Sequence, residues 1–268
     1  MSRADPKLEA LEALVEAHAR ELHLPSVRGR FRELARETER EGQTPLAYLA
    51  ALLEAELADR SERRERRRTH EARFPVVKRL EEFRFADNPK INRATIASLA
   101  EGHWIDGNES VILIGESGTG KTHLATALAL RACSQGRRVR FTTLAGLANE
   151  LIEARSAQEL ARAIGRWRRY ELLAIDELGY LALPEGAAEL VFQVISERNE
   201  RGALITTTNL PFTEWGKVFT DPRLAKAVVD RITHRCHIIE TGTQSWRLGH
   251  GLGRARGTGA DEGRGAAG

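Results

Sequence analysis

The chain has 268 residues, of which 41% are hydrophobic and 29% charged, as in a globular protein with one substantial domain and room for a smaller one. No apolar run approaches the roughly eighteen residues of a membrane span, and the charged start MSRADPKLEALEAL excludes a signal peptide there. Two cysteines, Cys133 and Cys236, exclude a disulfide framework. We therefore expect a cytoplasmic protein with no membrane partner.

Residues 1–75 predict a small helical domain that ends in a basic connecting helix. Leu8, Leu11 and Leu22 recur at helical spacing near the start of the chain. After EGQTP, the stretch LAYLAALLEAELADR resumes the helical pattern and continues into an arginine-rich run. Pro75 marks the latest point at which this helix can end.

The positive charge of the chain is concentrated in two segments, although the net charge is only +3. Residues 60–73 hold seven Arg against three Glu, and residues 162–170 hold four Arg beside Trp167 and Tyr170. Each segment has two interpretations that the sequence leaves open. One is a solvated helix face, and the other is a surface that contacts the phosphates of DNA.

Residues 76–248 predict an α/β domain built on a five-stranded parallel sheet. Short apolar runs alternate with helical patterns, which is typical of a parallel sheet covered by helices on both faces. The predicted strands are residues 111–114, 139–143, 172–175, 203–208 and 236–239. The last segment, residues 249–268, is Gly-rich without apolar periodicity and predicts a disordered tail.

The stretch VILIGESGTGKTHLATALAL, residues 111–130, predicts a nucleotide-binding loop between a strand and a helix. GESGTGKT fits the pattern G-x-x-x-x-G-K-[ST], in which backbone N–H groups and the helix N-terminus hold phosphates. Lys121 is expected to reach the β- and γ-phosphates of ATP, and the Thr122 hydroxyl to bind Mg²⁺. The candidate nucleotide-binding residues are Gly115, Glu116, Ser117, Gly118, Thr119, Gly120, Lys121, Thr122 and His123.

Polar residues at the ends of two later strands complete the predicted site. Asp176 and Glu177 follow the buried run LLAI, and in open α/β sheets ligands bind at the carboxyl ends of the strands. Asp176 is a candidate for Mg²⁺ binding through water, and Glu177 for orienting or deprotonating the attacking water. Asn209 ends the run ALITTT and is a candidate for a hydrogen bond to the γ-phosphate or to that water. The alternatives are charged residues that begin a loop and a turn-forming Asn before Leu-Pro.

Arg231 is the fourth catalytic candidate, at the end of a helical pattern just before the last strand. It suits an arginine finger that acts on the nucleotide of a neighbouring subunit, and it equally suits a cap for its own helix C-terminus. Arg223 is the alternative finger. The nearby sequence HRCH raises the question of zinc, but no second Cys/His cluster could complete a tetrahedral site, so a packed strand is expected.

These motifs together resemble the IstB-type AAA+ ATPases, helper proteins of insertion-sequence transposition that are related to the DnaC helicase loaders. The resemblance covers residues 1–248 and rests on GESGTGKTHLA, RVRFTT, LLAIDELGYL, TTTNLPFTEWGKVF, LAKAVVDRITHRCHIIE and SWRL. It implies a P-loop ATPase domain without a C-terminal lid domain. By the family pattern, residues 115–122 match the Walker A loop, Asp176 and Glu177 the Walker B pair, Asn209 sensor 1, and Arg231 the finger.

The sequence departs from the family pattern at three places: Glu116-Ser117 in the loop, TTTN where TSN is commoner, and Trp246 in SWR. None of these changes an expected catalytic residue. The resemblance implies an ATP- and Mg²⁺-dependent homo-oligomer that binds double-stranded DNA and recruits or activates a transposase. The alternatives are a replicative helicase loader, a small-molecule kinase that uses the same loop, and a DNA-binding adaptor that barely hydrolyses ATP.

Overall fold

The computed structural model describes residues 6–184 and 186–243. These residues form two compact units, and the boundary between Arg67 and Arg68 lies inside helix α3 (Pro45–Ala72). The sequence placed the domain boundary at residue 75, just beyond the end of this helix. The predicted tail at residues 249–268 and Trp246 lie outside the described residues.

The N-terminal unit consists of helices, as the periodic leucines predicted. It contains α1 (Pro6–Glu21), α2 (Pro25–Arg40) and the first part of α3, and each of the three helices begins with proline. Proline suits the first helical position because its φ is already helical and its missing N–H is not needed there. The small core of the unit consists of Ala19, Val27, Phe31 and Leu52.

A buried carboxylate joins α3 to α2 within this unit. Glu56 of α3 accepts hydrogen bonds from the backbone N–H groups of Ser26 and Val27, at 2.9 and 3.2 Å, and so satisfies the free N-terminus of α2. Burial would raise the pKa of Glu56, but the hydrogen bonds from Arg60 and from these two N–H groups outweigh it and hold the pKa below its ordinary value.

Several arginines of the predicted basic segment in α3 are engaged within the helix. Arg60 and Arg63 pair with Glu56, at 2.8 and 3.5 Å, and Arg66 pairs with Glu62 at 2.6 Å. Arg64, Arg66 and Arg67 nevertheless remain exposed. Both interpretations of this segment therefore stay open.

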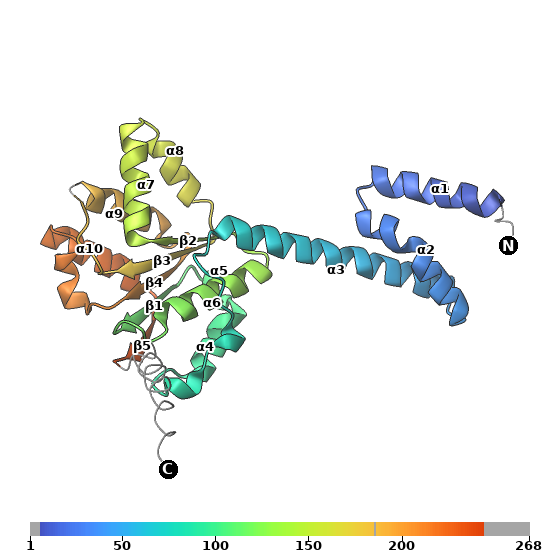
Figure 1. Ribbon diagram of the computed structural model, residues 1–268. Coiled ribbons are helices and arrows are strands. Elements are labelled where there is room, and N and C mark those ends of the chain that lie inside the picture. The colour runs from blue at the N-terminus through green and yellow to red at the C-terminus, as the bar shows by residue number, and fades with distance from the viewer. Residues whose placement is uncertain (1–5, 185, 244–268) are drawn as a thin grey trace, which may run out of the picture. The chain divides into compact units, whose positions relative to one another are not determined.

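The second unit is built on a five-stranded parallel sheet, which confirms the predicted fold class (Figure 1). The strand order is β2-β3-β4-β1-β5, and every neighbouring pair is parallel. The strands are β1 (Ser110–Gly115), β2 (Val139–Thr143), β3 (Leu172–Leu178), β4 (Ala203–Thr208) and β5 (Cys236–Gly242). The run ALITTT of β4 is buried along its whole length, as expected for a strand covered on both faces.

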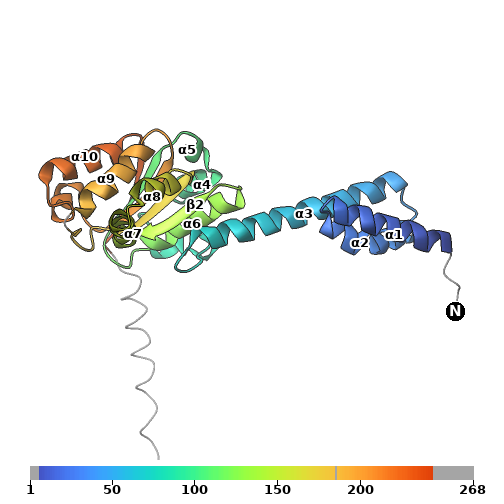
Figure 2. The same cartoon turned by 90° about the horizontal axis from the view of Figure 1, so that it is seen from above.

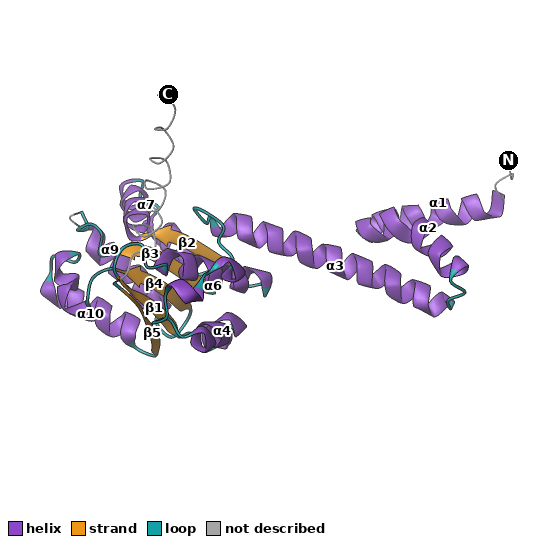
Figure 3. Cartoon of the chain, turned by 60° about the horizontal axis from the view of Figure 1, so that its bottom comes forward, coloured by secondary structure: helices purple, strands orange, loops and turns teal. Residues whose placement is uncertain are grey.

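Helices cover both faces of this sheet and enclose two apolar cores (Figures 1 and 3). The helices on one face are α4 (Arg93–Glu101), α5 (His103–Asp106) and α6 (Lys121–Ser134). The helices on the other face are α7 (Leu144–Ser156), α8 (Leu160–Trp167), α9 (Ala187–Arg198) and α10 (Pro222–Thr233). The short 3₁₀ helices are η1 (Leu80–Glu82), η2 (Phe85–Asp87) and η3 (Phe212–Lys217). Figure 2 shows the same elements from above.

The second predicted basic segment, residues 162–170, has its tryptophan in the core. Trp167 is only 2% exposed and lies under the guanidinium of Arg140, 5.5 Å from the ring centroid. Its backbone carbonyl accepts a 2.9 Å hydrogen bond from Arg198, a buried side chain whose pKa burial lowers to about 10. This tryptophan is therefore not available to stack on a base, whereas the four arginines of the segment are exposed and Tyr170 is half-buried.

The HRCH sequence spans the turn from α10 into β5, which begins at Cys236, and its two histidines contact carboxylates. His237 lies 2.8 Å from Glu109, and His234 lies 3.6 Å from Glu200. Across the described residues, no three His, Cys, Asp or Glu side chains gather as a metal-binding group. No helix in the same part of the chain combines the length and apolar character that crossing a bilayer requires.

Candidate nucleotide-binding site

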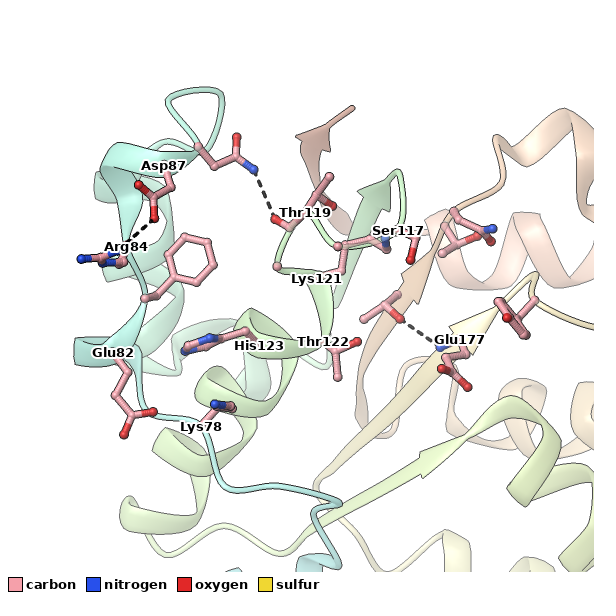
Figure 4. A pocket seen from close by; sticks show the side chains of 18 residues that line it. Lys78, Glu82, Arg84, Asp87, Ser117, Thr119, Lys121, Thr122, His123 and Glu177 are labelled. Carbon is pink, nitrogen blue, oxygen red and sulfur yellow. Dashed lines mark hydrogen bonds and ion pairs between the residues drawn. The ribbon is translucent and has the colours of Figure 1, made fainter. Parts of the chain in front are cut away.

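A cavity opens at the carboxyl edge of the sheet, where three parts of the chain meet (Figure 4). One wall comes from the segment between Lys78 and Asn88, and another from the loop and helix start between Ser117 and His123. The floor comes from the ends of β3 and β4, through Glu177 and Asn209 among others. The candidate residues of three separate motifs therefore line one space.

Two glycines of the loop are required by close approaches of other parts of the chain. A Cβ on Gly115 would lie 2.7 Å from the backbone oxygen of Gly242, and Gly115 has a φ of 156°. A Cβ on Gly120 would lie 2.7 Å from the ring of Phe83, at a φ of 94° that side chains rarely adopt. The fixed glycines of the motif thus let the loop curl tightly beside β5 and the aromatic ring.

The side chain of Lys121 folds back onto the loop that it follows. Its ammonium group donates hydrogen bonds to the backbone oxygens of Gly115 and Glu116, each at 2.7 Å. The helix α6 begins at this residue, so the positive end of the helix and the lysine charge lie at the same end of the loop. An anion in the cavity would meet both.

The loop is also held from two distant parts of the chain. The side-chain amide of Asn88 donates to the backbone oxygens of Thr119 and Thr241, at 3.2 and 2.7 Å. The hydroxyls of Thr119 and Thr241 lie 2.6 Å apart. Sequence reasoning missed Asn88 and Thr241, because nothing in the local sequence around either residue signals a contact with the loop.

The expected metal-binding residues are in contact with each other. Thr122 Oγ1 donates to Asp176 Oδ1 at 3.1 Å, which joins the helix after the loop to the end of β3. Asp176 is only 5% exposed, whereas its neighbour Glu177 is exposed and lines the cavity. The two acids therefore have different surroundings although they are adjacent in sequence.

Aromatic side chains form the wall opposite the acids. The ring of Phe83 meets His123 and Phe85 edge to face, with centroids 5.2 and 4.9 Å away. His123 Nε2 lies 2.9 Å from the backbone oxygen of Arg79. No sequence motif predicted a role for Phe83, whose ring lies close to Gly120 and so brings this segment over the loop.

Arg231 does not join these residues. It is exposed in the last turn of α10 and lines a second cavity with Ser110, His234 and Arg235. Ser110 is the first residue of β1, so this cavity lies at the amino edge of the sheet, at the opposite end of the strands from the loop. Among the described residues, the Arg231 guanidinium makes no hydrogen bond or ion pair. Arg223, the alternative finger, is exposed in the first turn of α10.

Comparison with known proteins places the chain in a family. A model of the IstB-like ATP binding protein family matches residues 17–252. The chain belongs to this family. A relative from Sinorhizobium fredii, named for an insertion sequence and for ATP binding, is 35% identical over 237 residues, or 88% of this chain and 80% of the relative. A Pseudomonas aeruginosa relative, named for insertion sequence IS21 and for ATP binding, is 36% identical over 201 residues, or 75% of this chain and 76% of the relative.

Solved structures with a similar fold come from DNA replication proteins. A replication initiator DnaA bound to AMPPCP and single-stranded DNA matches with a TM-score of 0.50 at 19% identity. A DNA replication initiation factor matches with a TM-score of 0.50 at 20% identity. Each match covers 62% of this chain and 50% of the other chain. At this identity the similarity establishes the AAA+ P-loop fold of the IstB-like chain and no more.

We expect Lys121→Ala to weaken ATP binding by about 10- to 100-fold, because a charged hydrogen-bond donor to phosphate is typically worth this much. Direct titration with ATP measures the effect. Lys226→Ala is the matched control, because it removes the same charge from an exposed position on α10 outside the cavity. Equal affinity of the Lys121→Ala protein and the unaltered protein would contradict the assignment of the loop.

Proposed function

We propose that this IstB-like protein is a Mg²⁺-dependent ATPase of DNA transposition. In this proposal it assembles as a homo-oligomer on double-stranded DNA and recruits or activates a transposase. The observation that carries the ATPase part is the 3.1 Å contact of Thr122 with Asp176, beside Lys121 and with Glu177 exposed to the same cavity. The names of the relatives, which refer to insertion sequences, support transposition rather than helicase loading.

The residues around Thr122 fit Mg²⁺ by their chemistry. A hydroxyl and a carboxylate are the hard oxygen ligands that Mg²⁺ prefers, and the ion keeps water and phosphate oxygens as its other ligands. When bound, Mg²⁺ would neutralise charge on the β- and γ-phosphates. Thr122 would hold it directly and Asp176 through water.

The remaining residues would bind ATP and activate water. Lys121 would exchange the carbonyl oxygens of Gly115 and Glu116 for phosphate oxygens, and the wall formed by Phe83 and His123 offers an apolar seat for the base. Glu177 would take a proton from the water that attacks the γ-phosphorus, while the bond to the bridging oxygen breaks and ADP leaves. Asn209, at the same edge, would hydrogen-bond the γ-phosphate or the attacking water without adding negative charge.

Glu177→Gln should keep ATP binding and lower the hydrolysis rate by about 10²- to 10⁴-fold, the usual contribution of a general base. Phosphate release and ATP titration measure the two effects separately. Glu240→Gln is the matched control, because it neutralises another exposed acid near the same edge of the sheet. Unaltered hydrolysis by the Glu177→Gln protein would mean that this residue is not the base. No hydrolysis by the unaltered protein would favour an adaptor that only binds ATP.

The exposed arginines of α3 should contribute to DNA binding that is largely independent of sequence. Each phosphate contact adds about 0.9 to the slope of log affinity against log salt concentration. Replacing Arg64, Arg66 and Arg67 by Ala should therefore lower that slope by about 2 to 3, measured by titrating duplex DNA at several salt concentrations. The control variant replaces Arg28, Arg36 and Arg40 by Ala. These residues are exposed on α2, so the control removes the same charge from another helix. If both triple variants had the same slope of log affinity against log salt concentration, the arginines of α3 would be a solvated helix face without a specific role in DNA binding.

Arg231 should act on the nucleotide of a neighbouring subunit, because it lies at the opposite edge of the sheet from its own loop. An arginine finger supplied in trans is worth about 10³- to 10⁵-fold in rate. Arg231→Ala should bind ATP normally and hydrolyse it poorly. Mixing Arg231→Ala with Lys121→Ala should partly restore hydrolysis, because the second protein supplies Arg231 to the intact loop of the first.

The same mixing experiment separates the finger from the two alternatives. A helix-capping Arg231 predicts a lower melting temperature for Arg231→Ala and no rescue on mixing. The finger would instead be Arg223 if two results were found together. Arg231→Ala would be fully active, and an inactive Arg223→Ala protein would regain hydrolysis when mixed with Lys121→Ala. Mixed oligomers that form and stay inactive would contradict action in trans.

A further inference from the structure

The pairing of β3 with β4 is irregular at the two acids. Ile175 pairs with Thr206, and the next pair is Leu178 with Thr208. Asp176 and Glu177 thus lie opposite a single residue, Thr207. An extra residue in a strand leaves backbone groups without their usual partners and redirects side chains.

Glu177 adopts an uncommon backbone conformation at this point. Its φ is 60°, in the left-handed region that residues with a side chain rarely adopt. Such a conformation persists only where neighbouring groups hold it. It also turns the Glu177 side chain into the cavity, while Asp176 before it and Leu178 after it stay buried.

One hydroxyl holds both acids. Thr207 Oγ1 accepts a hydrogen bond from the backbone N–H of Glu177 at 3.0 Å, and the same hydroxyl donates to Asp176 Oδ1 (Figure 4 shows the bond to Glu177). Thr207 is 2% exposed, so water has little access to replace either bond. Because Asp176 Oδ1 also accepts from Thr122, the hydroxyl links β4 to the phosphate loop through the carboxylate.

We infer that Thr207 is a positioning residue that sets the geometry of the Asp176–Glu177 pair. Its hydroxyl accepts from the backbone N–H of Glu177, which lies in the irregular part of the pairing, and donates to the side-chain carboxylate of Asp176. Threonine is restricted at χ1, so the hydroxyl is held in place more firmly than that of serine. The expected effect of Thr207 on hydrolysis rests on the proposed ATPase function. Its effect on Asp176 can be tested without hydrolysis, through the Mg²⁺ dependence of ATP binding.

The adjacent residue provides a matched control. Thr206 has the same side chain in the same strand and is 0% exposed, yet its hydroxyl has no hydrogen-bond partner among the described residues. Replacing Thr206 by valine removes a hydroxyl that makes no bond. Replacing Thr207 by valine removes one that makes two, at almost the same volume.

The experiment compares Thr207→Val, Thr207→Ser and Thr206→Val in the full chain. ATP affinity is titrated with and without Mg²⁺, and hydrolysis is measured against ATP and Mg²⁺ concentration. We expect Thr207→Val to lower kcat and to raise the half-saturating Mg²⁺ concentration by about 10- to 100-fold each, the range for loss of a buried charged hydrogen bond. Its ATP affinity without Mg²⁺ should not change. Thr207→Ser should recover most of both effects, and Thr206→Val should match the unaltered protein.

Two results would overturn the inference. One is a Thr207→Val protein with unaltered kcat and Mg²⁺ dependence. The other is equal damage from Thr206→Val, which would indicate a general effect on the strand. If Thr207→Val fails to fold, Thr207→Ala must show the same two changes.

Failure of the inference about Thr207 can be distinguished from failure of the proposed ATPase function. If the unaltered protein binds ATP without hydrolysing it, the ATPase proposal fails. The Mg²⁺ dependence of ATP binding then still decides whether Thr207 positions Asp176.

Discussion

The hydrogen bond between Thr122 and Asp176 is the contact on which the rest of the site depends. It joins two residues that are 54 positions apart, and it can form only because β3 and β1 are parallel members of one sheet. Parallel strands bring their carboxyl ends to one edge, so the loop after β1 and the acids of β3 meet there. The two apolar cores keep the sheet rigid, and this fixes the distance between the loop and the acids.

The sequence predicted the sheet and the position of the glycine-rich loop between β1 and α6 well because their signals are local. The runs at residues 139–143 and 203–208 coincide with β2 and β4. The central strand β4 is buried throughout, as expected for a parallel sheet covered on both faces, whereas the edge strand β2 is only partly buried. The loop was predictable because its glycines and Lys121 occupy fixed positions. Asp176, Glu177 and Asn209 followed from one rule, that polar residues at the carboxyl end of a buried strand lie at the ligand-binding edge. In the structure β3 extends to Leu178, so both acids lie inside the strand, with Asp176 buried and Glu177 exposed.

The residues that the sequence did not reveal act through contacts far along the chain. Asn88 reaches Thr241 across 153 positions, and Phe83 covers Gly120 from a segment without regular strands or long helices. Thr207 was invisible for a different reason. It stands in the run Thr206-Thr207-Thr208, three identical side chains whose partners depend on the register of β4 against β3. Composition cannot say which of the three hydroxyls faces the acids.

The position of Arg231 explains why the proposed ATPase would need to assemble into an oligomer. Within one chain, the cavity has the loop and the start of α6 at one wall and Glu177 at its floor, but Arg231 lies at the other end of the strands. Lys121 alone would neutralise only part of the charge that develops on a transferring phosphate. If a neighbouring subunit supplies the missing cation, ATP can be bound by a single chain and hydrolysed only in the oligomer. The separation of Arg231 from its own loop would then make hydrolysis a consequence of assembly, because no side-chain rotation can carry that cation to its own site.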